Sequence, residues 1–352
     1  MKVLRLEKKI FPLFMYTLAK QWEIWGPIKK NDKHVFQKIN HFTELDLKAT
    51  RTVIPPKKFF VPSQFNMFSF DSDGYSEVME ELSPKILFGV HPCDIHGILI
   101  LDKLFSMEHP DPYYMKRREK TIIVGYSCVP DDKCFCHATR TSVIEEGYDL
   151  FFSDLKEFYL VWVGSSRGDD LIKLNPELFE EKIQKHDIEK FLEWKIWRDS
   201  QHMLQIDFSV LPDMMELRYT DPIWEEMASS CLACGSCSMV CPTCNCYNVH
   251  DYHRFGKADG KRARSWDSCM FREYSLVAGG HNFREKKADR LKLWYTHKLQ
   301  AFIGQFGKPS CIGCGRCIDT CPVDINVMTV ARALRDVPFD AFWKREAEKE
   351  AK

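Results

Sequence analysis

The sequence predicts an α+β protein of two domains: an α/β domain with a sheet over residues 1–220 and a mainly helical domain over residues 221–352. The length of 352 residues exceeds the ~150 residues of one typical domain. Apolar runs typical of strands fill the first half, and the cysteine-dense region begins just after Pro222, which follows a charged stretch. Together these observations place the domain boundary near residues 215–228.

Two apolar runs in the first half each lead into a segment that carries cysteine. Lys85–Val90 and Thr121–Tyr126 read as buried strands, and Ile95–Phe105 has apolar residues at helical spacing. Because both strands deliver a cysteine at their carboxyl ends, we expect an α/β layer there, with an open parallel or a mixed sheet.

The remaining expected elements are local readings of the same kind. They are strands at 148–152 and 158–163, a strand–loop–strand unit at 52–62, and helices at 176–198, 327–335 and 339–351.

The composition is that of an ordinary folded protein, with 45% hydrophobic and 28% charged residues. Lys plus Arg and Asp plus Glu both number 50, so no excess charge favours a nucleic-acid partner. Residues 1–20 lack the cleavage site of a signal peptide, and polar residues interrupt the longest apolar run, 86–105. We therefore expect a cytoplasmic protein without a membrane partner, whose 15 cysteines stay reduced and serve as metal ligands.

One pattern of cysteines, C-x2-C-x2-C-x3-C-P, occurs twice. It covers 231–242 and 311–322, and it is typical of proteins that hold two 4Fe–4S clusters, in which the fourth cysteine of each run binds the other cluster. The predicted ligand sets are Cys231, Cys234, Cys237 with Cys321, and Cys311, Cys314, Cys317 with Cys241. Two structural zinc sites are the alternative, although zinc ligands normally come in separated pairs.

Four cysteines of the first half form a candidate third set: Cys93, Cys128, Cys134 and Cys136. If the strands before Cys93 and Cys128 are neighbours, these thiols meet at one edge of the sheet and could hold a third 4Fe–4S cluster. Buried inert thiols are the alternative.

Three further cysteines remain: Cys244, Cys246 and Cys269. They could replace Cys241 as the crossing ligand, hold another centre with a ligand other than cysteine, or pack around the clusters. Packing is the default, because no fourth ligand is evident.

Several longer strings carry a resemblance to a known family. They are 55–60 (PPKKFF), 88–94 (FGVHPCD), 111–114 (DPYY), 117–119 (RRE), 134–136 (CFC), 241–246 (CPTCNC), 266–269 (WDSC) and 277–284 (VAGGHNFR). With them the chain resembles the β subunits of cytoplasmic NAD(P)-linked nickel-iron hydrogenases, the sulfhydrogenases. The A subunit of anaerobic sulfite reductase is similar and belongs to the same wider family.

The resemblance implies a non-catalytic subunit of an oxidoreductase complex that relays electrons between a flavin and NAD(P)-binding subunit and the hydrogenase subunits. The residues agree, because the sequence has neither G-x-G-x-x-G nor a Walker A motif and no evident catalytic arrangement. The resemblance leaves open an electron-input subunit of sulfite reductase or of a flavin-linked heterodisulfide reductase. A flavin enzyme and a zinc scaffold are more distant alternatives.

Overall fold

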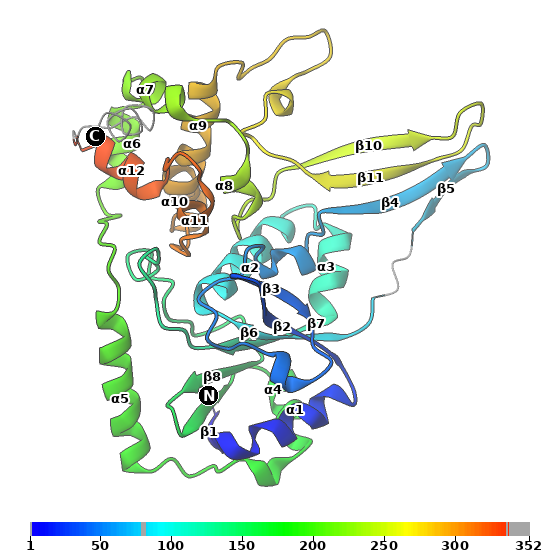
Figure 1. Cartoon of the computed structure of the whole chain (residues 1–352). Coiled ribbons are helices and arrows are strands. Elements are labelled where there is room, and N and C mark those ends of the chain that lie inside the picture. The colour runs from blue at the N-terminus through cyan, green and yellow to red at the C-terminus, as the bar shows by residue number, and fades with distance from the viewer. Residues whose placement is uncertain (1, 79–81, 336, 338–352) are drawn as a thin grey trace. The chain divides into compact units, whose positions relative to one another are not determined.

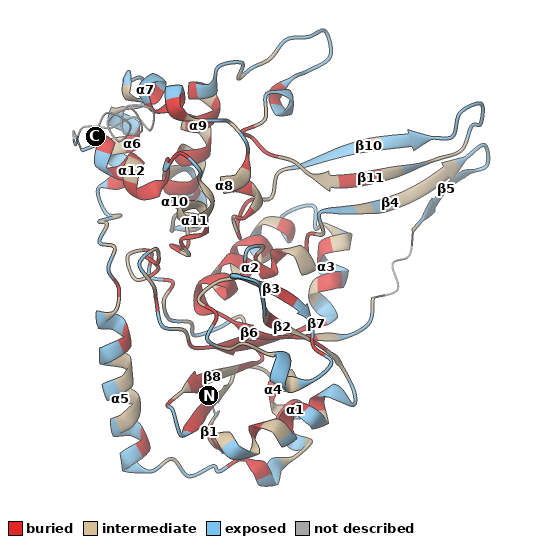
Figure 2. Cartoon of the chain, in the orientation of Figure 1, coloured by how far each residue is buried: buried red, intermediate tan, exposed pale blue. Residues whose placement is uncertain are grey.

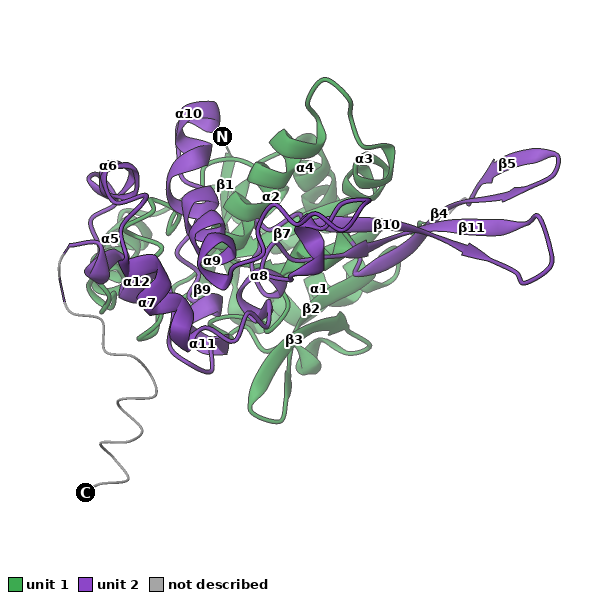
Figure 3. Ribbon diagram, turned by 90° about the horizontal axis from the view of Figure 1, so that it is seen from above, with its two compact units in different colours: residues 1–61, 79–204 green, residues 62–78, 205–352 purple. Residues whose placement is uncertain are grey.

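The computed structural model describes residues 2–78, 82–335 and 337, and it divides the chain into two compact units (Figure 1). The first unit comprises Met1–Val61 and Met79–Leu204, and the second comprises Pro62–Val78 and Gln205–Lys352 (Figure 3). This division differs from the expected boundary at residue 220. The second unit begins earlier and also takes a short segment from the N-terminal half.

A mixed sheet of seven strands forms the centre of the first unit. Its strands are β1 (Lys2–Glu7), β2 (Glu23–Lys30), β3 (Lys33–Lys38), β6 (Lys85–Val90), β7 (Thr121–Tyr126), β8 (Leu150–Asp154) and β9 (Phe158–Val163). The order is β1-β9-β8-β7-β6-β2-β3, in which β2, β6, β7 and β8 are parallel and the other neighbours are antiparallel. Of the two expected sheet types, the structure has the mixed one.

Helices cover both faces of this sheet, as Figure 1 shows. They are α1 (Phe11–Ala19), α2 (Pro92–Phe105), α3 (Pro112–Glu119), α4 (Ser166–Lys173) and α5 (Lys185–Ser200), with single turns at Lys8–Ile10, Phe42–Glu44, Pro56–Phe59 and Pro176–Leu178. Helices α1 and α4 share one hydrophobic core with the sheet, whereas α5 packs on the opposite face of β9 through Phe191 and Trp194.

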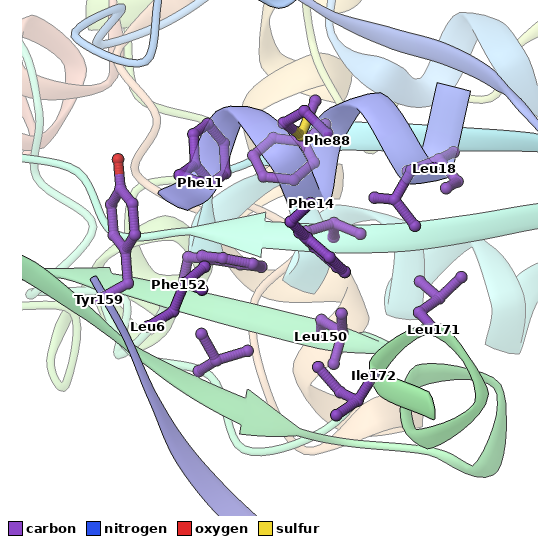
Figure 4. Packing of buried hydrophobic residues seen from close by; sticks show 14 of the residues in the cluster. Leu6, Phe11, Phe14, Leu18, Phe88, Leu150, Phe152, Tyr159, Leu171 and Ile172 are labelled. Carbon is purple, nitrogen blue, oxygen red and sulfur yellow. The ribbon is translucent and has the colours of Figure 1, made fainter. Parts of the chain in front are cut away.

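Aromatic rings make up the middle of the core beneath α1 (Figure 4). The Phe11 ring centroid lies 5.7 Å from that of Phe88, 6.0 Å from that of Phe152 and 5.2 Å from that of Tyr159. Strands β6 and β7 are buried almost along their whole lengths (Figure 2), as expected for parallel strands covered on both faces.

The strands expected at 85–90, 121–126, 148–152 and 158–163 are confirmed to within two residues. Helix α2 begins at Pro92, so Cys93 lies in the first helical turn rather than in a loop. The two strands expected at 52–62 are wrong, because Pro55 and Pro56 lead into a short 3-10 turn. The helix expected from 176 begins only at Lys185.

The second unit contains helices around the two cysteine repeats. They are α6 (Leu211–Leu217), α7 (Ile223–Ser230), α8 (Ser236–Met239), α9 (Lys287–Thr296), α10 (Phe302–Phe306), α11 (Arg316–Thr320) and α12 (Val327–Ala333), with a 3-10 turn at Glu273–Ser275 and a π-helical turn at His297–Ala301. The α+β class is confirmed, as is the helix after residue 327. The helix expected at 339–351 lies outside the described residues.

A four-stranded antiparallel sheet in the second unit was not expected from the sequence. Its order is β10-β11-β4-β5, with bounds Tyr247–His253, Gly260–Trp266, Gln64–Asp71 and Gly74–Glu77. Pairing of β4 with β11 explains why residues 62–78 belong to this unit. None of the described helices is long and apolar enough to cross a membrane.

We predict that Gly168→Ala destabilises the first unit by about 1–3 kcal/mol, because overpacking a closed site forces the backbone apart. A β-carbon at Gly168 would lie 1.9 Å from the carbonyl oxygen of Asp149. At Gly304, also helical, nothing lies within 4 Å of the added carbon, so Gly304→Ala is the matched control. Denaturant unfolding measures both, and equal stability of the two variants would contradict the packing argument.

Candidate metal centres

Each cysteine repeat folds into the same local structure. Ala233 and Gly313, one residue before the second cysteine, have φ angles of 51° and 62°. The glycine that follows that cysteine also has a left-handed conformation, with φ of 73° at Gly235 and 76° at Gly315. A short helix, α8 or α11, then carries the third cysteine, so the backbone curves around one point in both repeats.

The first predicted set is brought together around one cavity. Its lining includes three cysteines of the first repeat and one of the second: Cys231, Cys234, Cys237 and Cys321. Apolar side chains, among them Met270 and Leu291, line the same cavity. Cysteines from both repeats therefore line one small, largely apolar cavity.

The members of the second predicted set also lie close together. Burial and the neighbouring Cys314 and Cys241 together raise the pKa of Cys311 to about 12. Burial also raises the pKa of Cys317 far above its usual value, as do the charges of Cys311, Cys314 and Cys241. The fourth cysteine of the first repeat thus lies with the three leading cysteines of the second.

Backbone N–H groups donate to the sulfur atoms at corresponding places of the two repeats. The amide of Ala233 lies 3.4 Å from the sulfur of Cys231, and the amide of Gly313 donates to Cys311. Cys321 accepts from the amide of Ile325 at 3.2 Å and from that of Val323. Such bonds favour the thiolate, the form that binds metal.

A buried tyrosine lies beside both sets. Tyr295 in α9 is fully enclosed, and burial raises its pKa well above the usual value, as do the charges of Cys317, Cys237 and Cys321. Tyr295 lines the cavity of the first set together with Cys237 and Cys321, and it is close enough to the second set for the charge of Cys317 to act on it.

The donor chemistry fits two 4Fe–4S clusters. Each set offers four cysteines and amide donors to sulfur, and seven of the eight cysteines are partly buried whereas Cys234 is exposed. Within the described part of the chain, no three His, Cys, Asp or Glu side chains are gathered closely enough to hold a single metal ion. The closeness of the first set therefore rests on the cavity that its cysteines share. That of the second set rests on the effect of its cysteines on one another's pKa values.

The three remaining cysteines of the second unit lie around a buried lysine rather than in either set. Cys246 accepts hydrogen bonds from Cys269 and Tyr274, which lower its pKa, and Lys298 adds its positive charge. Cys244 is hydrogen-bonded to Lys298. The structure gives these thiols polar partners, which packing alone would not require.

The N-terminal set is brought together only in part. Burial is the main reason why the pKa of Cys134 is raised to about 12. Cys128 lies near enough to contribute to this rise. Arg51 donates to the Cys134 sulfur at 3.3 Å and pairs with Asp131. Cys93 and Cys136 are buried in the same unit.

Sequence reasoning missed the basic groups beside these cysteines. They include Arg51 and Arg198 in the first unit and Lys298 in the second unit. The side chain of Arg198 donates to the Cys128 carbonyl at 2.8 Å. His202 was missed as well. Its ring lies 4.3 Å from that of His137, beside Cys134. No local pattern marks such residues, because they are far from the cysteines in sequence.

Comparison with known proteins agrees with this chemistry. Residues 230–325 match the family model of the 4Fe-4S dicluster domain, which makes the chain an iron–sulfur protein. Over 337 residues it is 38% identical to the sulfhydrogenase 2 subunit β of Pyrococcus furiosus, a match that covers 96% of this chain and 99% of that relative. The chain belongs to the family of sulfhydrogenase β subunits, and its role is iron–sulfur electron transfer.

We predict that His202 makes the chain less stable in acid. Burial lowers its pKa to about 4, below the ordinary 6.5, so the unfolded chain binds this proton more readily than the folded one. The free energy of unfolding is therefore lost as the pH falls from about 6.5 towards 4. Thermal unfolding of His202→Gln should depend less on pH in this range than that of the parent protein; equal slopes would contradict the assignment.

Proposed function

We propose that this chain relays electrons between a flavin and NAD(P)-binding subunit and a nickel-iron hydrogenase module, through two 4Fe–4S clusters and a third in the first unit. The ligands of the first cluster are Cys231, Cys234, Cys237 and Cys321, and those of the second are Cys311, Cys314, Cys317 and Cys241. When bound, each cluster takes up and releases one electron at a time.

The observation that carries the proposal is the exchange of the fourth cysteine between the repeats. Cys321 lines the cavity of the first repeat, and Cys241 lies with the cysteines of the second. This exchange is the arrangement of two-cluster ferredoxins, in which the two centres are close neighbours. Fast one-electron transfer between them needs that closeness.

The residues of the chain hold, insulate and polarise the clusters. Amides such as those of Ala233 and Ile325 donate to ligand sulfur, which stabilises negative charge there. Leu291, Met270 and Tyr295 line the cavity of the first set, and the charge of Cys317 in the second set also acts on Tyr295. The chain binds and orients redox groups and makes no covalent bond in a substrate.

We assign Cys93, Cys128, Cys134 and Cys136 to the third cluster. The closeness of Cys128 to Cys134 supports this assignment, as does the positive charge of Arg51 beside Cys134, because cationic donors stabilise thiolates. None of the 15 cysteines forms a disulfide in the described part of the chain, which favours a cytoplasmic location.

Metal analysis of the chain purified without oxygen tests the proposal. We expect about twelve irons and as many acid-labile sulfides per chain, no zinc, and EPR signals of reduced 4Fe–4S clusters. About eight irons would restrict the clusters to the second unit, and zinc in place of iron would refute the relay.

The ligand assignment is tested by three single substitutions. Cys237→Ala and Cys317→Ala should each remove about four irons, one cluster's complement, whereas Cys134→Ala should remove the third cluster. Cys246→Ala, a thiol outside all three sets, is the matched control and should keep its iron. Loss of iron from the control alone would reassign the ligands.

The partner subunits are tested by purification of the native complex. We expect nickel and flavin to copurify with the chain, because a hydrogenase module holds nickel. Sirohaem in place of nickel would instead assign the chain to sulfite reduction.

A further inference from the structure

A lysine lies fully buried beside the second set of cysteines. Lys298 is 1% exposed and stands in the π-helical turn His297–Ala301 between α9 and α10. The same turn holds the second repeat, because the Cys311 amide donates to the Lys298 carbonyl at 3.1 Å. Burial of an ammonium group is costly unless negative or polar partners surround it.

The ammonium group of Lys298 is hydrogen-bonded to a residue that adjoins one of the proposed cluster ligands. Its Nζ donates to the Thr243 hydroxyl at 3.0 Å, and that hydroxyl donates to the Ser310 carbonyl at 2.8 Å and lies 3.3 Å from the sulfur of Cys241. The ammonium group is also hydrogen-bonded to Cys244, and the cysteines around it, Cys241, Cys244 and Cys311, raise its pKa although burial opposes the shift.

The histidine next to Lys298 supplies no charge of its own at neutral pH. Burial and the ammonium of Lys298 together lower the pKa of His297 to about 4. Lys298 is therefore the charged member of this pair.

The two repeats differ at the residue that receives this lysine. Thr243 follows Cys241 and Pro242, whereas the corresponding residue after Cys321 and Pro322 is Val323, which has no hydroxyl. The first set does have a basic neighbour in Arg290, but its guanidinium donates to three backbone carbonyls, those of Met270, Arg284 and Glu285. The polar link from a buried cation through a hydroxyl to a ligand sulfur is thus a feature of the second set.

We propose that Lys298, acting with Thr243, raises the reduction potential of the cluster held by Cys311, Cys314, Cys317 and Cys241. The reduced cluster carries one more negative charge than the oxidised one, so a buried ammonium stabilises the reduced form more. The Thr243 hydroxyl accepts from this ammonium and lies beside the Cys241 sulfur, so it fixes the positive charge close to that ligand. Lys298 acts on the cluster through the position of its charge. This inference rests on the proposed pair of clusters.

EPR-monitored redox titration of the full chain tests this role. Lys298→Met removes the charge and keeps most of the volume. One of the two midpoint potentials of the second unit should fall by at least about 59 mV. For a one-electron couple, this shift lowers the ratio of reduced to oxidised cluster at least tenfold at a fixed potential. The other potential should move much less.

Three further variants separate charge from structure. Lys298→Arg keeps the charge and should restore most of the potential, while Thr243→Val should shift the same potential downward by less. Lys257→Met removes an exposed lysine near the hairpin tip and should shift neither.

The results distinguish this inference from the relay itself. A parent chain without iron or EPR signals would refute the clusters. Clusters of full iron content whose potentials do not move in Lys298→Met, or move equally, would overturn only the role of Lys298. Loss of iron in both Lys298 variants with no shift in Thr243→Val would overturn it too, because the lysine would then serve folding alone.

Discussion

The second unit gathers the eight cysteines that we propose as cluster ligands, and their thiol groups must be negatively charged to bind iron. Seven of them are partly removed from water, and Cys234 is exposed. Burial alone opposes this charge, as the raised pKa values of Cys311 and Cys317 show. The unit offers two features that offset the cost, amides directed at sulfur and a buried ammonium group, and the iron of the proposed clusters would add its positive charge. Much of the local backbone serves this end, including the left-handed residues that aim the amides.

The same constraint explains why the two repeats are interdependent. Because Cys321 lies with the first set and Cys241 with the second, neither set is complete within its own stretch of chain. In the proposed clusters, metal binding would tie residues near 235 to residues near 315, and part of the stability of the helices around them would then depend on the metal.

Much of the fold was predictable because local sequence patterns indicate it. The apolar runs of β6 and β7 and the two cysteine motifs needed only a few neighbouring residues. The β4–β11 pairing was not predictable, since about 190 residues separate the strands and periodicity does not reveal long-range partners. Lys298 and Arg51 were missed for the same reason: their significance lies in sulfur atoms that approach them only in the folded chain.

The pairing of β4 and β5 with β11 has a consequence during synthesis of the chain. Strands Gln64–Asp71 and Gly74–Glu77 leave the ribosome about 190 residues before β11, a delay of about 10–40 s at the usual rates of translation. A hairpin of two strands is only marginally stable in water, and its open edge can pair with other chains. The nascent protein must therefore protect this edge while the first unit is already able to fold, and a fragment that starts at Gln205 would lack half of the sheet.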